Sequence, residues 1–161
     1  MVATKVQAIP DIHIGRVYDR RDPESDIHYE TFERLAQFFG RNTPAHLHYC
    51  YYQVHILVRG SNHLNLDDRV YRATAPLNIY DSHVITVRQE IVRAWFKAMP
   101  GQWPEALLRE PTFFELDKLP EDAQADGHTL RQIVALLQQE SDANRAGRSA
   151  ALLALGQSFF I

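Results

Sequence analysis

The stretch GRNTPAHLHYCYYQVHILVRG (residues 40–60) constrains the fold more than any other part of the sequence. His46 and His48 are two residues apart, and Gln53 and His55 repeat this spacing. On an extended strand, residues two apart point to the same side. Pro44 and the glycines at the two ends, Gly40 and Gly60, mark turns. The pattern therefore predicts a strand, a connection and a second strand, whose inward faces bring four nitrogen- or oxygen-bearing side chains together.

Length and composition favour one domain, or one domain with a helical appendage. The chain has 161 residues, of which 45% are apolar, enough for a buried core. A net charge of −3 argues against direct nucleic-acid binding. The single cysteine, Cys50, excludes an intramolecular disulfide and fits a reducing compartment. Without a signal peptide or a long apolar run, we expect a cytoplasmic protein with no membrane partner.

Two interpretations are open for the segment before the histidine-rich stretch. Apolar residues with the helical spacing i, i+3, i+4, i+7 are Phe32, Leu35, Ala36 and Phe39. They predict a helix that is capped by Gly40. A strand over residues 28–35 is the alternative.

Further elements follow from simple periodicity. Residues 63–66 and 70–73 alternate in polarity around two aspartates and predict a short hairpin. Ile85 and Val87 alternate as in a strand. The period then changes to that of a helix, and the apolar residues with helical spacing are Val92, Trp95, Phe96 and Met99.

The last third of the chain predicts an antiparallel helical pair. The first apolar stripe is Leu130, Ile133, Val134 and Leu137, and the second is Leu152, Leu155, Gly156 and Phe159. The first stripe either joins two protomers in a homodimer or packs on the chain's own strands. The apolar end, residues 159–161, leads us to expect that the protein continues beyond it.

The spacing in residues 40–60 resembles the first motif of the cupin barrel family. That motif reads Gly, five residues, His, one residue, His, three or four residues, Glu, six residues, Gly. Every spacing fits, but the position of the glutamate is Gln53, a weaker metal ligand. No second cupin motif is found between Pro76 and His83.

Nearly the whole chain is similar to the N-terminal effector domain of AraC-type transcriptional regulators. The segments that carry the resemblance are residues 9–60, HVITVRQEIV (83–92) and ALLALGQSFFI (151–161). The closest subgroup activates the catabolism of 4-hydroxyphenylacetate and related aromatic acids. The subgroup has a strand and a proline-rich turn where this chain has only LNIYD (77–81). Either the protein lacks that loop, or the given sequence omits residues that the protein has. A protein without the loop would have unpaired strand edges, so we favour the second interpretation.

The resemblance implies a mainly β fold with C-terminal helices. A cupin-like effector-binding barrel would span residues 1–90, and a helical linker and dimerisation region would span 91–161. The resemblance also implies a helix-turn-helix DNA-binding domain, which is absent from this chain. Contact with DNA would therefore belong to the missing domain.

The histidine cluster has three interpretations. In the first, His46, His48 and His55 hold a divalent transition metal, zinc or nickel, although the sequence assigns no definite cofactor. With Gln53 they could instead hydrogen-bond a small aromatic carboxylic acid, or they could be barrel-interior residues that satisfy one another. Arg16, Arg59 and Arg72 are candidate clamps for a carboxylate, and either Tyr51 or Tyr52 would line the slot for the ring.

We therefore expect a non-enzymatic sensor of hydroxyphenylacetate-like acids within a transcription activator. A metal-dependent cupin enzyme that acts on a small aromatic substrate is the alternative. A sugar-sensing regulator is a third interpretation.

Overall fold

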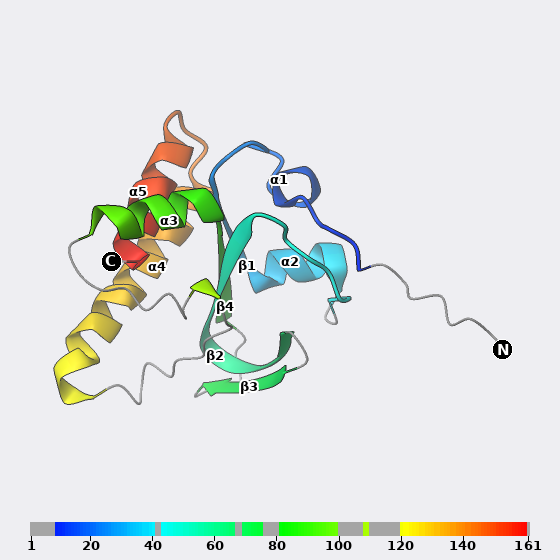
Figure 1. Ribbon diagram of the computed structural model, residues 1–161. Helices are drawn as coiled ribbons and strands as arrows, with labels where there is room; N and C mark the ends of the chain where they lie inside the picture. The colour runs from blue at the N-terminus through cyan, green and yellow to red at the C-terminus, as the bar shows by residue number, and fades with distance from the viewer. Residues whose placement is uncertain are drawn as a thin grey trace.

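A computed structural model describes residues 9–40, 43–66, 69–75, 81–99, 108–109 and 120–160. Its strands form a four-stranded antiparallel sheet in the order β1-β4-β2-β3 (Figure 1). The strands are β1 (Ile27–Thr31), β2 (Tyr51–Leu66), β3 (Arg69–Ala75) and β4 (Asp81–Arg88). In the described residues β1 and β3 are edge strands, so the sheet is open and the predicted closed barrel is not formed. Residues 76–80, where the sequence predicts omitted residues, lie outside the described part.

Helices cover both faces of the sheet. They are α1 (Ile14–Val17), α2 (Phe32–Phe39), α3 (Gln89–Ala98), the 3-10 turn η3 (Glu121–Ala123), α4 (Gln124–Asp142) and α5 (Arg148–Phe160). The long helices α3, α4 and α5 lie on one side of the sheet, and α1 and α2 lie on the other (Figure 1). The predicted antiparallel strands followed by a C-terminal helical pair are confirmed. Helices are too prominent for a mainly β fold.

Both interpretations of residues 28–39 are correct in part. The strand β1 ends at Thr31, whose hydroxyl accepts a hydrogen bond from the Arg34 backbone N–H and caps α2. The helix ends at Gly40, whose φ of 74° lies in the left-handed region that glycine adopts without strain. The predicted C-terminal glycine cap is therefore confirmed.

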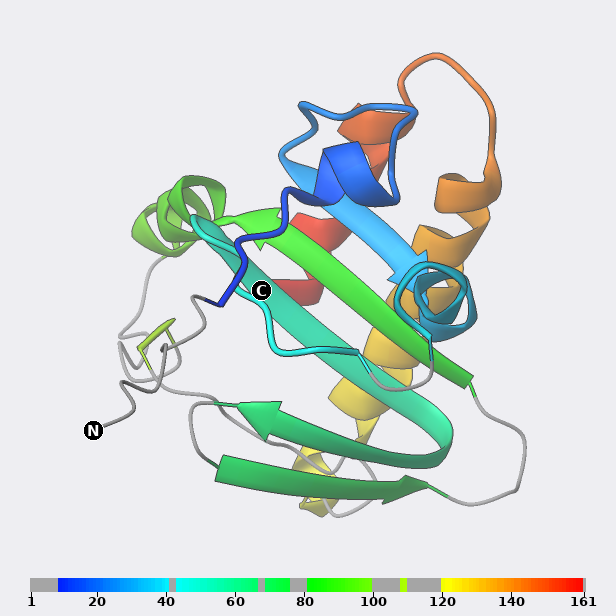
Figure 2. The same cartoon turned by 90° about the vertical axis from the view of Figure 1, so that its right-hand side faces the viewer.

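The strand β2 is long enough to pair with two other strands. Its first part pairs with β4, and Gly60–Leu66 pairs with β3. The register shifts between Leu57 and Arg59, and β2 bends between the two parts (Figure 2). The predicted short hairpin is confirmed, with His63 opposite Arg72.

The prediction of a strand around His46 and His48 is wrong. Residues 43–50 are irregular, and an isolated parallel bridge joins Leu47 to Asp11. Two local features explain the difference. Pro44 has no N–H for a sheet ladder, and Cys50 has a positive φ of 67° immediately before β2.

The core lies between the sheet and the long helices. It comprises Ile27, Tyr29, Ile85, Val87, Val92, Trp95, Ile133, Leu137 and Leu152. Alternate residues of β1 and β4 supply the sheet side, as the two-residue period requires. The core draws on residues before and after residue 90, so the two predicted regions share it.

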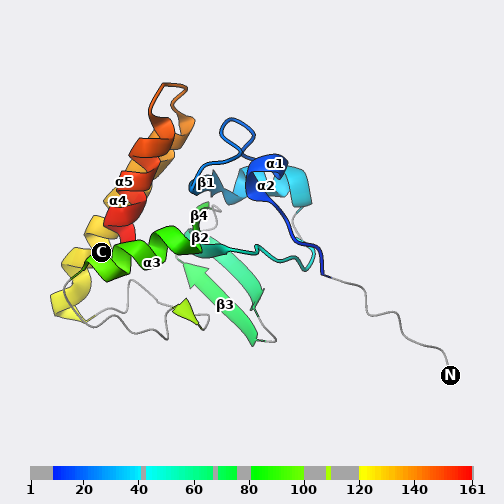
Figure 3. The same cartoon turned by 45° about the horizontal axis from the view of Figure 1, so that its top comes forward.

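The helices α4 and α5 pack side by side (Figure 3). Ile133, Val134 and Leu137 on α4 are buried within the single chain, and Leu130 is half-buried. Packing of this stripe on the chain's own strands was one of the two alternatives, and the burial favours it.

None of the described helices is both long and apolar enough to cross a lipid bilayer.

Candidate functional site

The sheet face opposite the core carries polar side chains in register. Directly opposed residues of antiparallel strands share a face. One row across β1, β4 and β2 contains His28, Thr86 and Gln53, and the next contains Glu30, Val84 and His55. We call this surface the polar face. His28, Glu30 and Thr86 are almost fully buried, which is unusual for a polar surface.

The N-terminal arm, which includes α1, covers the polar face. The N-terminal arm, residues 9–19, crosses it and places Asp19 Oδ2 at 2.9 Å from His28 Nδ1. Tyr18 hydrogen-bonds with Thr86, and burial raises the pKa of the Tyr18 hydroxyl. The ring of His13 meets the Tyr51 ring edge-on, with centroids 6.5 Å apart. The arm is thus held by side chains of the face that it covers.

His46 and His48 meet beside this cover through their Nε2 atoms, 2.9 Å apart. His46 Nδ1 donates to the Pro44 carbonyl oxygen at 2.7 Å, and His48 Nδ1 donates to that of Ile12 at 3.0 Å. A carbonyl oxygen only accepts, so each Nδ1 carries a hydrogen and each neutral ring has a bare Nε2. Two bare nitrogens attract each other only when a proton or another cation lies between them.

His55 contributes a third imidazole. Its Nε2 lies 3.2 Å from Gln53 Oε1 and donates to it, which leaves Nδ1 as a bare acceptor. Burial lowers the pKa of His55 to about 4, and the charges of His48 and His46 act in the same direction. Burial also lowers the pKa of His48. At neutral pH both rings are therefore uncharged.

The imidazole pair fits two ligands of a transition metal. Metal-binding histidines typically donate their other ring N–H to a carbonyl or carboxylate, as His46 and His48 do. Within the described part of the chain, no three His, Cys, Asp or Glu side chains are grouped closely enough to hold an ion. His55 therefore does not complete the predicted set of three metal ligands in this arrangement.

Buried polar atoms without hydrogen-bond partners gather on the polar face. Among the described residues these atoms include His28 Nε2, Tyr51 Oη, His55 Nδ1 and Ser82 Oγ. Buried polar groups are normally paired, because an unpaired one loses its bonds to water without replacement. A ligand or ordered water with both donors and acceptors would satisfy them.

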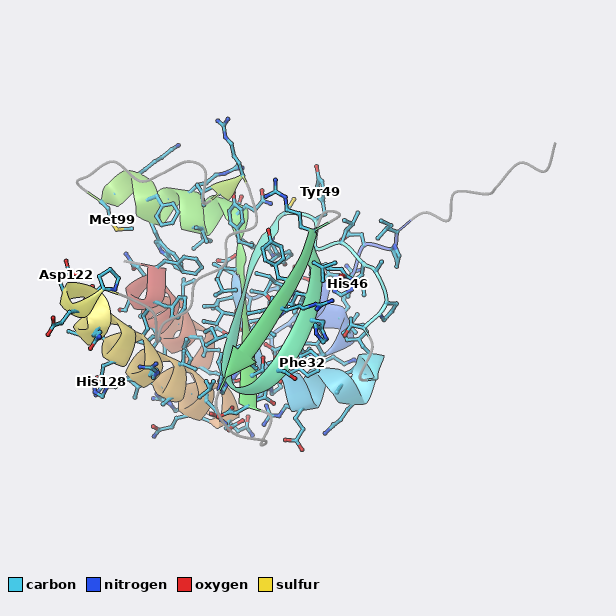
Figure 4. The ribbon with its side chains drawn as sticks, turned by 90° about the horizontal axis from the view of Figure 1, so that it is seen from below. Phe32, His46, Tyr49, Met99, Asp122 and His128 are labelled. Atoms are coloured by element: carbon cyan, nitrogen blue, oxygen red, sulfur yellow. The ribbon has the colours of Figure 1, made fainter. Side chains whose placement is uncertain are left out.

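His48 borders a depression on the surface. An open depression of about 290 Å³ is lined by Leu47, His48, Tyr49, Cys50 and Gln89. Tyr49 projects outward there (Figure 4), whereas the ring of His46 stacks on the ring of Phe39, with centroids 5.7 Å apart. His48 therefore lies between solvent and the covered face.

Two of the three predicted carboxylate clamps are exposed on the surface. Arg16 is exposed on α1 and Arg72 is exposed on β3, and the side chain of Arg59 lies outside the described residues. Other guanidinium groups lie at the polar face: that of Arg88 is 5.7 Å from the centroid of the Tyr51 ring. Those of Arg21 and Arg34 lie 3.8 and 3.6 Å from the carboxylate of Glu30. Of the two tyrosines that the sequence offers for the ring slot, Tyr51 lies on the polar face.

Sequence reasoning missed Asp19, His28, Glu30 and Thr86. His28 lies outside the histidine-rich stretch of residues 40–60 that the sequence pattern singles out. The available signal was the alternation of polar residues in IHYET (27–31) and in DSHVITVR (81–88). Only the register shows that these residues and Gln53 lie on one surface.

The chain matches no protein-family model, no curated protein and no solved structure. The fold and the site define a mixed protein of helices and antiparallel strands with a covered polar face. What that face binds has to be argued from its own chemistry.

Proposed function

We propose that this chain is the effector-sensing part of an AraC-type transcription activator, and that it binds a small hydroxylated aromatic acid on the polar face. The observation that carries the proposal is the set of unpartnered buried atoms on this face, from His28, Tyr51, His55 and Ser82. The motif resemblance of residues 40–60 supports the class of protein. DNA contact would belong to a further domain.

The chemistry of the face suits a ligand with hydroxyl and carboxyl groups. The bare nitrogens of His48 and His55 accept hydrogen bonds from a phenol or a protonated acid. A bound carboxylate would favour protonation of these rings, because an opposite charge nearby stabilises the charged form. Affinity for an aromatic acid should therefore increase as the pH falls from about 8 to about 6, and affinity for a neutral phenol should change less.

Thermal unfolding with and without ligand tests the proposal. Hydroxyphenylacetate at about 100 times its dissociation constant should add roughly 2.7 kcal/mol to the free energy of unfolding, whereas a pentose sugar should add none. His48→Ala should weaken acid binding and leave the oligomeric state unchanged. His63→Ala, at an exposed position of β2, is the matched control. Stabilisation by sugars alone would instead favour a sugar sensor.

A metal-dependent cupin enzyme remains the second candidate, because of the convergent His46 and His48 Nε2 atoms. Isothermal titration with zinc and nickel, followed by the double variant His46→Ala/His48→Ala, tests metal binding. The enzyme candidate requires metal uptake that the double variant abolishes, together with turnover of an aromatic substrate. Metal uptake without turnover would favour a metal-assisted sensor.

A homodimer is part of the proposal. Because Ile133 and Leu137 are buried within the chain, an α4 contact between protomers would use the outer side of the helix. Leu136 lies there with 48% of its surface exposed. Leu136→Asp should reduce the mass measured by light scattering if this side of α4 forms the contact.

A further inference from the structure

A network of buried charged and polar side chains joins the polar face to the connection between α4 and α5. Its members have at most 7% of their surface exposed, and they are Asp19, His28, Glu30, Ser141 and Arg148. Charged side chains are almost never buried to this degree unless they are paired. The connection between α4 and α5 and the loop that follows α1 lie at the same end of the molecule (Figure 1).

The carboxylate of Asp19 is the centre of this network. Its Oδ2 lies 2.9 Å from His28 Nδ1 and 3.6 Å from Arg148 Nη2, so one oxygen atom is shared between the polar face and α5. Its Oδ1 lies 3.4 Å from Arg21 Nε, and Arg21 also reaches the carboxylate of Glu30 at 3.8 Å. Burial alone would raise the pKa of Asp19, but the hydrogen bond from His28 and the charge of Arg148 hold it below its ordinary value. Asp19 is therefore ionised at neutral pH and only accepts hydrogen bonds.

The two arginines beside Asp19 contact the end of α4. Arg148 Nε and Arg21 Nη1 both donate to the Ser141 carbonyl oxygen, at 3.1 and 2.6 Å. This carbonyl belongs to the last turn of α4, where carbonyl groups have no partner within the helix. The Ser141 hydroxyl donates to the Tyr29 carbonyl oxygen on β1 at 3.2 Å. The guanidinium groups that Asp19 contacts thus join the arm and α5 to the end of α4.

His28 has a second ring nitrogen, Nε2, which a ligand on the polar face can use. Because the ionised Asp19 only accepts, Nδ1 of the neutral ring carries the hydrogen and Nε2 is a bare acceptor. Nε2 has no hydrogen-bond partner among the described residues. A hydroxyl group that donates to Nε2 strengthens the bond from Nδ1 to Asp19, because hydrogen bonds in a chain polarise one another. The shared oxygen is then drawn towards His28 and away from Arg148.

We propose that Asp19 couples the polar face to the connection between α4 and α5, so that a ligand bonded to His28 loosens the contact between Asp19 and Arg148. This inference rests on the proposed binding of an effector at the polar face. The shared oxygen sets the direction of the effect, because a stronger bond to His28 leaves a weaker one for Arg148. The connection between α4 and α5 therefore opens more readily in the ligand-bound protein.

A double-mutant cycle on the unfolding equilibrium of the whole chain tests the coupling without a ligand. His28→Leu and Arg148→Lys should be nonadditive by at least about threefold in the unfolding equilibrium constant, more than separate sites show. In an Asp19→Asn background the same two substitutions should be additive. Arg93→Lys, at an exposed position of α3, replaces Arg148→Lys in the control cycle and should be additive with His28→Leu.

Hydrogen exchange with mass spectrometry tests the response to a ligand in the wild-type protein and does not depend on a variant that folds. With 4-hydroxyphenylacetate at saturation, the amides of residues 143–150 should exchange at least about fivefold faster, the lower end of typical coupling between two sites. His28→Asn keeps an N–H donor for Asp19 but lacks Nε2. Exchange of residues 143–150 in this variant should not respond to the ligand.

The outcomes distinguish this inference from the effector proposal. Nonadditivity that disappears in the Asp19→Asn background supports the coupling, whereas additivity in both backgrounds, or equal nonadditivity in both, overturns it. A ligand that stabilises the protein but leaves the exchange of residues 143–150 unchanged also overturns it, and the effector proposal then stands. If 4-hydroxyphenylacetate does not stabilise the protein, the effector proposal fails, and the cycle alone decides whether Asp19 couples the two regions.

Discussion

At the scale of single residues, the buried histidines make the protein sensitive to acid. His55 is held neutral by burial, with its pKa lowered to about 4, whereas an unfolded chain titrates near the ordinary value of about 6.5. The unfolded state therefore binds the proton first as the pH falls. Stability from this group is complete above about pH 6.5 and decreases as the pH falls towards about 4.

We predict that wild type loses on the order of 2 kcal/mol of unfolding free energy through His55 between about pH 7.5 and about pH 5. His55→Gln should flatten this part of the pH dependence, because glutamine does not titrate. The measurement is the urea midpoint at each pH. His63→Gln, which changes an exposed histidine on the same strand, should keep the wild-type slope. A variant with an unchanged slope would show that His55 is not protected from protonation.

At the scale of elements, two glycines set how closely segments pack. A Cβ on Gly15 would lie 2.1 Å from the Pro23 carbonyl oxygen and 2.4 Å from its Cα, so backbone would have to move. A Cβ on Gly156 would lie 2.4 Å from Cδ1 of Ile27, the end of a side chain that can rotate. The backbone of Pro23 cannot easily move away from a side chain at position 15, whereas the Ile27 side chain can rotate away from one at position 156.

Gly15→Ala should therefore destabilise the fold by about 1–3 kcal/mol or more, the range for an overpacked core. Gly156→Ala should stay within about 1 kcal/mol of wild type, because alanine is preferred to glycine in a helix and offsets the contact with Ile27. Chemical denaturation of the two variants side by side is the measurement. Equal losses would mean that the arm adjusts as easily as the Ile27 side chain.

On α4, neighbouring leucines have opposite environments. Leu137 is fully buried in the core, and Leu136 is 48% exposed. Leu137→Ala should cost about 2–5 kcal/mol, as expected for truncation of a core leucine. Leu136→Ala should change stability by less than about 0.5 kcal/mol. If the two variants unfolded at the same urea concentration, the stripe would not face the chain's own core.

At the scale of the whole molecule, local pattern predicted elements better than their assembly. The helical spacing of Val92 and Trp95 and the alternation of Ile85 and Val87 mark α3 and β4, because one face of each is buried. The polar face could not be read in this way. Its residues come from three strands, and only long-range pairing decides that His28 lies in a row with Gln53.

The N-terminal arm and the neighbouring residues 43–50 are connected by few backbone hydrogen bonds. One β-bridge joins residues 9–12 to residues 43–50, with hydrogen bonds from Ile12 N to Leu47 O at 2.8 Å and from Leu47 N to Pro10 O at 2.9 Å. Side chains add two hydrogen bonds, from His48 Nδ1 to Ile12 O and from Tyr49 N to Asp11 Oδ1, both at 3.0 Å. Segments with few backbone bonds open locally at low free energy. Local opening of these segments therefore does not require separation of β2 from β4.

We predict that the Ile12 and Leu47 amides exchange with deuterium at least about 100-fold faster than those of Val84 and Thr86, which corresponds to about 2.7 kcal/mol less protection. A bound aromatic acid should slow exchange in the cover and leave β4 unchanged. Measurement is by hydrogen exchange with mass spectrometry. Uniform protection throughout would rule out local opening of this segment.

Asp19 has one further consequence, because its carboxylate contacts both His28 on the polar face and Arg148 at the start of α5. A change in the charge or position of His28 therefore alters the partner that Asp19 offers to Arg148. The coupling is reciprocal, because a free-energy change that His28 imposes on Arg148 equals the change that Arg148 imposes on His28. One aspartate thus links the polar face to the first turn of α5.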